Sequence, residues 1–194
     1  MPDADLSSAA WRVPPSRYLE GRPAEHGVPA EPLSRYVTMR DGCRLALDLW
    51  LPQGATGPVP TILVHTPYYR RFALKPGGTG ERCPNAARFR DVFVPRGYAL
   101  VVVDIRGTGA SFGTRDSFRS PKEREDGREI AEWIVAQPWS DGRIGATGIS
   151  YPGAASDFLA STGHPAVRAI APLFAVWDTW AEPSTPAISG SRIS

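Results

Sequence analysis

The chain has 194 residues, enough for one domain with its own hydrophobic core, and its 42% apolar and 22% charged residues are ordinary for a globular protein. A formal net charge of +2, without a basic stripe carrying interleaved aromatic residues, argues against a nucleic-acid-binding protein. No apolar run approaches the ~18 residues of a transmembrane helix, and the N-terminus lacks the basic start and apolar stretch of a signal peptide, so we expect a cytoplasmic protein that does not bind membranes.

Residues 1–34 are rich in proline and show no hydrophobic periodicity, which predicts an N-terminal arm outside the folded domain. We expect this arm to be extended and to lie on the domain through Trp11 and Tyr18. The domain itself is predicted over residues 35–194.

The domain is predicted to begin with a β-hairpin in residues 35–52, because two runs of alternating apolar residues flank Asp41-Gly42, a strong turn signal. After it, short apolar runs typical of buried strands alternate with segments of helical periodicity. These strands and helices are predicted, in chain order, at residues 61–65, 85–98, 98–104, 120–137, 143–150, 153–162 and 167–176. The alternation predicts an α/β fold with a mostly parallel sheet and helices on both faces.

The helix predicted at residues 120–137 has the clearest start signal. Ser120 is expected to cap its N-terminus and Glu123 to complete a capping box. Helical spacing predicts an inward face made of Ile130, Trp133, Ile134 and Gln137.

Polar residues follow the predicted strands where these end. They lie at residues 65–68, 104–107, 150 and 177–178. Because the carboxyl ends of parallel strands share one rim, and ligands bind at that rim, we expect the functional site there. Asp104 and Arg106 are expected to be structural, either as an ion pair or bound to loop carbonyls.

The segment "GATGISYPGAAS", residues 145–156, places Ser150 between a predicted strand and a predicted helix. A serine on such a tight turn is exposed above the sheet, and a helix N-terminus beside it favours developing negative charge. We therefore predict that Ser150 is a nucleophile, that Gly148 and Gly153 let the strand and helix approach, and that the backbone N–H of Tyr151 faces an oxyanion. The alternative is an ordinary Gly-Ser turn without chemistry.

Four segments in order resemble the CocE/NonD serine hydrolases, the cocaine-esterase-like and X-prolyl-dipeptidyl-peptidase-like family. They are "TILVHTPYYR", "VVVDIRGTGASFG", "EDGREIAEWIVAQPWSDGRIGATG" and "GISYPG". The resemblance covers about residues 35–180 and implies an α/β-hydrolase fold. It also implies that the hydroxyl of Tyr68 belongs to the oxyanion hole, although a packed aromatic is the alternative and the adjacent Tyr69 makes the register ambiguous. The family's glycine two places after the serine is replaced by Pro152, which a first helical turn tolerates.

A serine nucleophile needs a base, and α/β-hydrolases supply the acid and then the histidine after the serine. Only His164 follows Ser150, and it is expected in a loop at the opposite end of the sheet. His65 precedes the serine and His26 lies in the arm, while Asp178 lacks a partner histidine. We therefore expect a partial hydrolase domain whose cap, last strands and triad Asp and His lie beyond the chain.

Two consequences are expected of such a partial domain. The strand at residues 168–176 should be an exposed edge that favours self-association. Catalysis should be weak, since oxyanion hole and binding alone leave only ~10³–10⁴-fold over water.

The predicted activity is hydrolysis of a small ester or amide, including X-Pro peptides, without a metal or other cofactor. Cys43 and Cys83 have no metal-ligand spacing and are expected to be free thiols. One alternative is a non-catalytic pseudoenzyme. Another is a nucleotide-binding protein, but the glycines at 107, 109 and 113 lack the dinucleotide-binding spacing and the helix that should follow.

Overall fold

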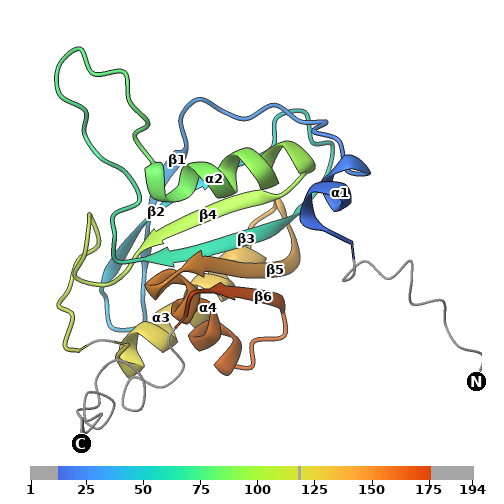
Figure 1. Ribbon diagram of the computed structural model, residues 1–194. Helices are drawn as coiled ribbons and strands as arrows, with labels where there is room; N and C mark the ends of the chain where they lie inside the picture. Colours follow the sequence, from blue (N-terminus) through green and yellow to red (C-terminus); the bar gives the residue numbers. More distant parts are fainter. Residues whose placement is uncertain (1–12, 118, 176–194) are drawn as a thin grey trace, which may run out of the picture.

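The computed structural model describes residues 13–117 and 119–175 (Figure 1). These residues form one six-stranded sheet in the order β1-β2-β4-β3-β5-β6. The strands are β1 (Leu33–Thr38), β2 (Arg44–Trp50), β3 (Val59–Thr66), β4 (Ala99–Asp104), β5 (Ser140–Ile149) and β6 (Val167–Leu173). β1 and β2 form the predicted antiparallel hairpin, β2 also runs antiparallel to β4, and all other neighbours are parallel. The α/β fold predicted from the sequence is confirmed.

Helices cover both faces of this sheet (Figure 1). They are α2 (Pro84–Phe93) with the 3-10 turn η3 (Val94–Arg96), α3 (Pro121–Val135) and α4 (Tyr151–Ser161), whereas α1 (Pro15–Glu20) lies in the arm beside the sheet. α2 packs on the face that carries Trp50, Ile62 and Val64, whereas α3 and α4 pack on the face that carries Leu47 and Leu63. The sheet is therefore the middle layer of three.

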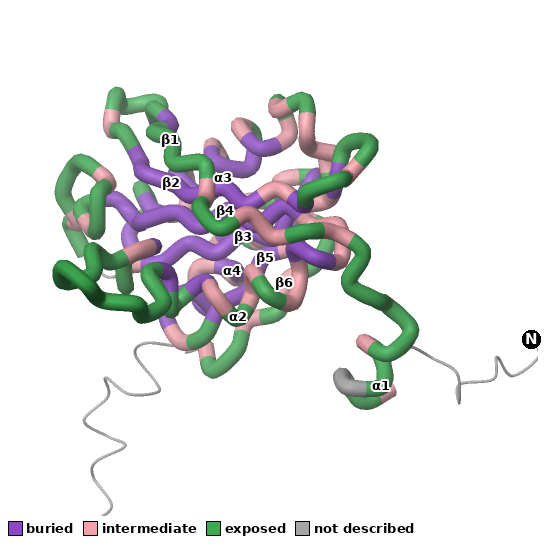
Figure 2. The backbone as a smooth tube through the Cα atoms, turned by 90° about the horizontal axis from the view of Figure 1, so that it is seen from above, coloured by how far each residue is buried: buried purple, intermediate pink, exposed green. Residues whose placement is uncertain are grey.

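β4 is the most deeply buried strand, as its unbroken apolar run predicts. Every residue of β4 is buried (Figure 2). Alternate side chains enter the two cores, with Val101 and Val103 toward α3 and Leu100 and Val102 toward α2. Each such side chain contributes about 1.5–3 kcal/mol of burial free energy, so β4 fixes the strands on either side of it.

α3 begins as predicted but uses Glu123 differently. The Ser120 side chain accepts a hydrogen bond from the backbone N–H of Glu123, at 3.3 Å. The Glu123 carboxylate, however, accepts a hydrogen bond from the Tyr151 hydroxyl instead of serving the expected capping box. Ile130 and Ile134 are buried as predicted, and the same helical stripe continues toward the N-terminus through buried acidic residues.

The arm contains a short helix, α1, that its prolines did not suggest. Pro15 occupies a first-turn position, where proline loses no hydrogen bond. Further along, the backbone N–H groups of Glu25 and His26 donate to the carbonyl of Pro95, at 2.8 and 3.0 Å. Residues 22–27 of the arm therefore contact the domain. Tyr18, in α1, is 38% exposed, and the Arg22 guanidinium lies 4.3 Å from its ring centroid. Trp11 lies outside the described residues, and the boundary at residue 34 stays a prediction.

β6 ends the sheet within the described residues, as predicted for an edge strand. The residues of β6 are partly buried or exposed, and Leu173 and Phe174 at its end are exposed. Among the helices that the structure describes, none is both long and apolar enough to cross a membrane.

Candidate active site

Ser150 occupies a strained turn between β5 and α4. Its backbone has φ 64° and ψ −119°, a left-handed φ that costs a non-glycine residue about 1–3 kcal/mol. Two hydrogen bonds hold this conformation: the Ser150 N–H donates to the Leu173 carbonyl at 2.8 Å, and the Ser150 carbonyl accepts from the Ala154 N–H at 3.0 Å. β6 and α4 together therefore fix a serine that remains partly exposed.

The glycines on either side of Ser150 lie where no side chain fits. A Cβ on Gly148 would overlap the side chain of Pro152, and a Cβ on Gly153 would lie 2.8 Å from the Leu173 carbonyl oxygen. Pro152 sits in the first turn of α4, where a missing N–H costs no hydrogen bond. The strand and the helix can therefore meet closely despite the proline after the serine.

The side chain of Tyr151 anchors this turn to α3. It is buried, and its hydroxyl donates to the Glu123 carboxylate and accepts from the Arg119 backbone N–H at 3.2 Å. The Arg115 guanidinium lies over its ring, 4.7 Å from the centroid. Burial, and then the hydrogen bond to Glu123, raise the pKa of Tyr151 to about 12. The Tyr151 hydroxyl is therefore bound to Glu123 of α3, whereas the backbone N–H of Tyr151 lies at the first position of α4.

Sequence reasoning missed the role of Glu123 in holding Tyr151. A signal was available, because Glu123 and Asp126 precede Ile130 and Ile134 at helical spacing on the same buried stripe. Acidic side chains on a buried helical face need hydrogen-bond donors, and the hydroxyl of Tyr151 is such a donor.

Tyr68 follows the end of β3 and is 45% exposed. Its backbone N–H donates to Thr66 Oγ1 at 3.0 Å, and its carbonyl accepts from the Asn85 side chain at 2.7 Å. Together with Ile149 and Pro152, which flank Ser150, Tyr68 lines a pocket of about 190 Å³.

Tyr69 is directed differently from Tyr68. It has a positive φ of 66° and packs edge-on against Phe72, with 5.9 Å between ring centroids. It is not among the residues that line the pocket beside Ser150. Of the two neighbouring tyrosines, Tyr68 is therefore the one that shares a pocket with the turn.

Asp104 and Arg106 are structural, but they do not pair with each other. Asp104 accepts hydrogen bonds from the backbone N–H groups of Arg70 and Ala110, at 2.7 and 3.0 Å, so it binds loop amides and not carbonyls. Burial raises the pKa of Asp104.

Arg106 links the end of β4 to α3 and to the turn between β1 and β2. Its guanidinium donates to both Asp126 oxygens, at 2.6 and 2.8 Å, and to Asp41 at 2.6 Å. Its hydrogen bond lowers the pKa of Asp41 to about 2. The glycine-rich segment after Arg106 packs back on the strand end, and the residues described between Arg106 and Pro121 contain no helix. This arrangement does not match a dinucleotide-binding turn.

The structure places the three histidines of the chain in three different surroundings. His65 is buried on the sheet side of α4 and lines a minute cavity with Pro152 and Ser156. His164 lies in the loop before β6, where its Nδ1 accepts from the Ala166 N–H at 3.2 Å. That loop is at the amino end of the parallel strands, roughly 20 Å from Ser150 by strand length. His26 lies in the arm, and its ring is close to Gly97, which precedes β4. Among the described residues, no hydrogen bond joins any of the three histidine rings to Ser150.

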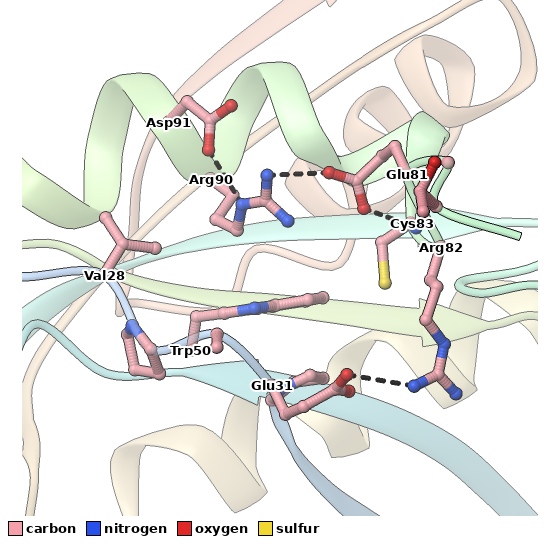
Figure 3. A pocket seen from close by; sticks show the side chains of 13 residues that line it. Val28, Glu31, Trp50, Glu81, Arg82, Cys83, Arg90 and Asp91 are labelled. Atoms are coloured by element: carbon pink, nitrogen blue, oxygen red, sulfur yellow. Dashed lines mark hydrogen bonds and ion pairs between the residues drawn. The ribbon is translucent and has the colours of Figure 1, made fainter. Parts of the chain in front are cut away.

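A larger pocket of about 560 Å³ lies between the arm, β2 and α2 (Figure 3). Its charged residues satisfy one another, since Arg82 pairs with Glu31 at 2.9 Å and Arg90 pairs with Glu81 at 2.8 Å. Cys83 is buried there, and burial raises the pKa of its thiol, which makes it less reactive.

Both cysteines are free, as predicted. In the part of the chain that the structure describes, no group of three or more His, Cys, Asp or Glu residues is arranged to hold a metal ion. The pocket beside Ser150 is smaller than the one beside Cys83, but it adjoins the strained serine, a helix N-terminus and a tyrosine.

The sequence pattern of the X-Pro dipeptidyl-peptidase (S15) family matches residues 41–186. The chain is 42% identical over 189 residues to a Mycobacterium bovis protein named "Putative serine esterase", covering 93% of this chain and 30% of that protein. It is 38% identical over 149 residues to the cocaine esterase of a Rhodococcus strain, covering 76% of this chain and 24% of the esterase. Its fold is similar to that of a CocE/NonD family hydrolase from Staphylococcus aureus, with a TM-score of 0.60 and 30% identity over 74% of this chain and 27% of that one. The chain thus spans 30% or less of the length of these relatives.

Proposed function

Because the chain belongs to the X-Pro dipeptidyl-peptidase (S15) family, we propose that it carries the nucleophile side of a serine hydrolase site that acts on the carbonyl of a small ester or amide. The observation that carries this proposal is the positive φ of Ser150 on a turn between a parallel strand and a helix. Strain of this kind persists only where the surrounding structure enforces it, and here β6 and α4 do so.

In the proposed reaction, Ser150 Oγ attacks the carbonyl carbon and the C=O π electrons move to oxygen, forming a tetrahedral oxyanion. The Tyr151 N–H and the Tyr68 hydroxyl are the proposed donors to that oxyanion. Each donor aimed at the developing charge lowers the barrier by about 3 kcal/mol. The N-terminus of α4 adds a favourable dipole at the same place.

The proton of the Ser150 hydroxyl passes to a solvent water, because no hydrogen bond among the described residues joins a histidine ring to Ser150. The oxyanion then collapses and expels the alcohol or amine, which takes up a proton from water. A further water hydrolyses the acyl-enzyme and restores the Ser150 hydroxyl. We therefore propose that the chain by itself is a weak hydrolase, with the ~10³–10⁴-fold acceleration that binding and an oxyanion hole provide without a triad. A non-catalytic role is the alternative. A cytoplasmic location, and self-association through the β6 edge, remain proposals that rest on the sequence and on the edge position of β6.

A fluorophosphonate probe tests the proposal directly, because it reacts with activated serines and its adduct is visible by intact mass. We expect one adduct on the wild-type chain, formed slowly because no histidine takes the Ser150 proton, and none on Ser150→Ala. Ser161→Ala, an exposed serine at the far end of α4, is the matched control and should label normally. Tyr68→Phe should label about 100-fold more slowly, as for loss of an oxyanion donor.

Two results would overturn the proposal. Labelling that persists in Ser150→Ala would place the reactive group elsewhere. Absence of labelling in a wild-type chain that is folded by circular dichroism would favour the non-catalytic role.

A further inference from the structure

The pocket beside Ser150 has an unusual lining for its size. It lies between the end of β3, the first turns of α2 and the Ser150 turn, and it holds about 190 Å³. Its walls are mainly apolar, formed by Val64, Phe89, Ile149 and Pro152. Since a liquid water takes about 30 Å³, this space equals the volume of about six waters. It suits one short arm of a substrate, not a whole peptide.

Arg88, on α2, is the one charged residue among those that line this pocket. Within the described part of the chain, no ion pair or hydrogen bond of its guanidinium is seen. Arg90, two residues further on, contrasts with it, because Glu81 and Asp91 both hold its guanidinium at 2.8 Å. The Asp91 carboxylate is therefore engaged by Arg90, although it follows Arg88 by one helical turn.

Besides Arg88, the polar side chains at the pocket are those of Thr66, Tyr68 and Asn85. Thr66 Oγ1 accepts a hydrogen bond from the backbone N–H of Tyr68 at 3.0 Å. Asn85 is also already hydrogen-bonded. Its amide donates to the carbonyls of Tyr68 and Tyr69, at 2.7 and 3.2 Å. Asn85 thereby holds the backbone of the segment after β3, from which Tyr68 lines the pocket. Arg88 is left as the group with five N–H donors and no described acceptor.

We propose that this pocket selects substrates whose short acyl or alcohol arm ends in a carboxylate. The inference rests on the proposed function, and it names the substrate class for the same site. The apolar walls bury the body of the arm, and the guanidinium of Arg88 receives the carboxylate, which it can bind through two parallel hydrogen bonds. The arm reaches the site from Ser150 along Ile149 and Pro152.

Boronic acids test this without turnover, because they form reversible tetrahedral adducts with an activated serine. The probes are phenylboronic acid, 3-carboxyphenylboronic acid and the methyl ester of the latter, each titrated by calorimetry into the 194-residue chain. The variants are Arg88→Gln, Ser150→Ala and the control Arg128→Gln, which removes an exposed arginine of α3 paired with Glu132.

We expect all three probes to bind in a Ser150-dependent manner. The carboxylate probe should bind about five-fold more tightly than its methyl ester, the upper range for a solvent-exposed ion pair, and 0.5 M salt should weaken this preference. Arg88→Gln should abolish the preference and leave phenylboronic acid binding unchanged. Arg128→Gln should leave all affinities unchanged.

The failures are distinguishable. Ser150-dependent binding of phenylboronic acid without a carboxylate preference, or with a preference that survives in Arg88→Gln, would overturn the inference alone. Absence of Ser150-dependent binding for every probe would overturn the inference together with the proposed function.

Discussion

His65 shows how a single buried side chain can make the fold sensitive to acid. It points from β3 into the layer beneath α4, and its Nε2 has no hydrogen-bond partner among the described residues. Burial lowers its pKa from 6.5 to about 4, and the nearby Asp126 opposes this shift only in part. The ring is therefore neutral in the folded chain near pH 7.

The sign of the resulting pH dependence follows from proton uptake. Between pH 6.5 and pH 4 the unfolded chain binds the His65 proton and the folded chain does not, so the free energy of unfolding falls as the pH falls. A shift of this size corresponds to a loss of roughly 3 kcal/mol over that window. Urea unfolding at pH 7.5, 6, 5 and 4.5 measures it.

His65→Leu should flatten the decline between pH 6.5 and 4, whatever its effect on stability at pH 7.5. His164→Asn, which changes a loop histidine, should retain the wild-type decline. If His65→Leu keeps the wild-type slope, another group carries the acid sensitivity.

At the scale of secondary-structure elements, the β5–α4 junction is tightly constrained. Gly148→Ala should destabilise the chain by about 1–3 kcal/mol or more, because its methyl group would overlap Pro152 and force the helix away from the strand. The same change should slow labelling of Ser150. Gly57→Ala is the control, since open space surrounds that glycine and its φ is not positive. Equal stability of the two variants in urea would contradict the packing argument.

The sequence predicted elements best where local pattern and tertiary burial agree. β4 is apolar throughout and buried throughout, and the Asp41-Gly42 turn needs the positive φ of 80° that Gly42 adopts. α1 escaped prediction because it has only six residues and its proline-rich sequence lacks helical periodicity.

The sequence predicted the parts of the candidate site that lie directly at strand ends. The turn at Ser150 and the pocket position of Tyr68 follow from strand ends meeting at one rim. The partners of the Glu123, Asp104 and Arg106 side chains did not follow, because all those described above except Ala110 lie 20 to 65 residues away in sequence and depend on how the loops fold over the rim. Local pattern carries no information about such pairings.

At the scale of the whole molecule, the two edges of the described sheet differ in how they are protected. β1 pairs with β2 on one side and carries the polar residues Ser34, Arg35 and Thr38, although Leu33 and Tyr36 are exposed as well. β6 is paired only with β5 among the described residues. It has one exposed charge, Arg168, and one proline, and otherwise presents alanines followed by exposed Leu173 and Phe174. An edge with unpaired backbone groups, small side chains and exposed apolar residues is a template for another strand.

We therefore expect the chain to self-associate as its concentration rises, through β6. Ala169→Lys places a charge on the exposed edge and should shift sedimentation-velocity profiles toward the monomer, because lysine on an edge strand disfavours a second strand. Ala136→Lys, an equal change at the exposed C-terminal end of α3, should associate like the wild type. A monomer at every concentration, or equal association of both variants, would show that β6 is covered by another part of the chain or that the contact lies elsewhere.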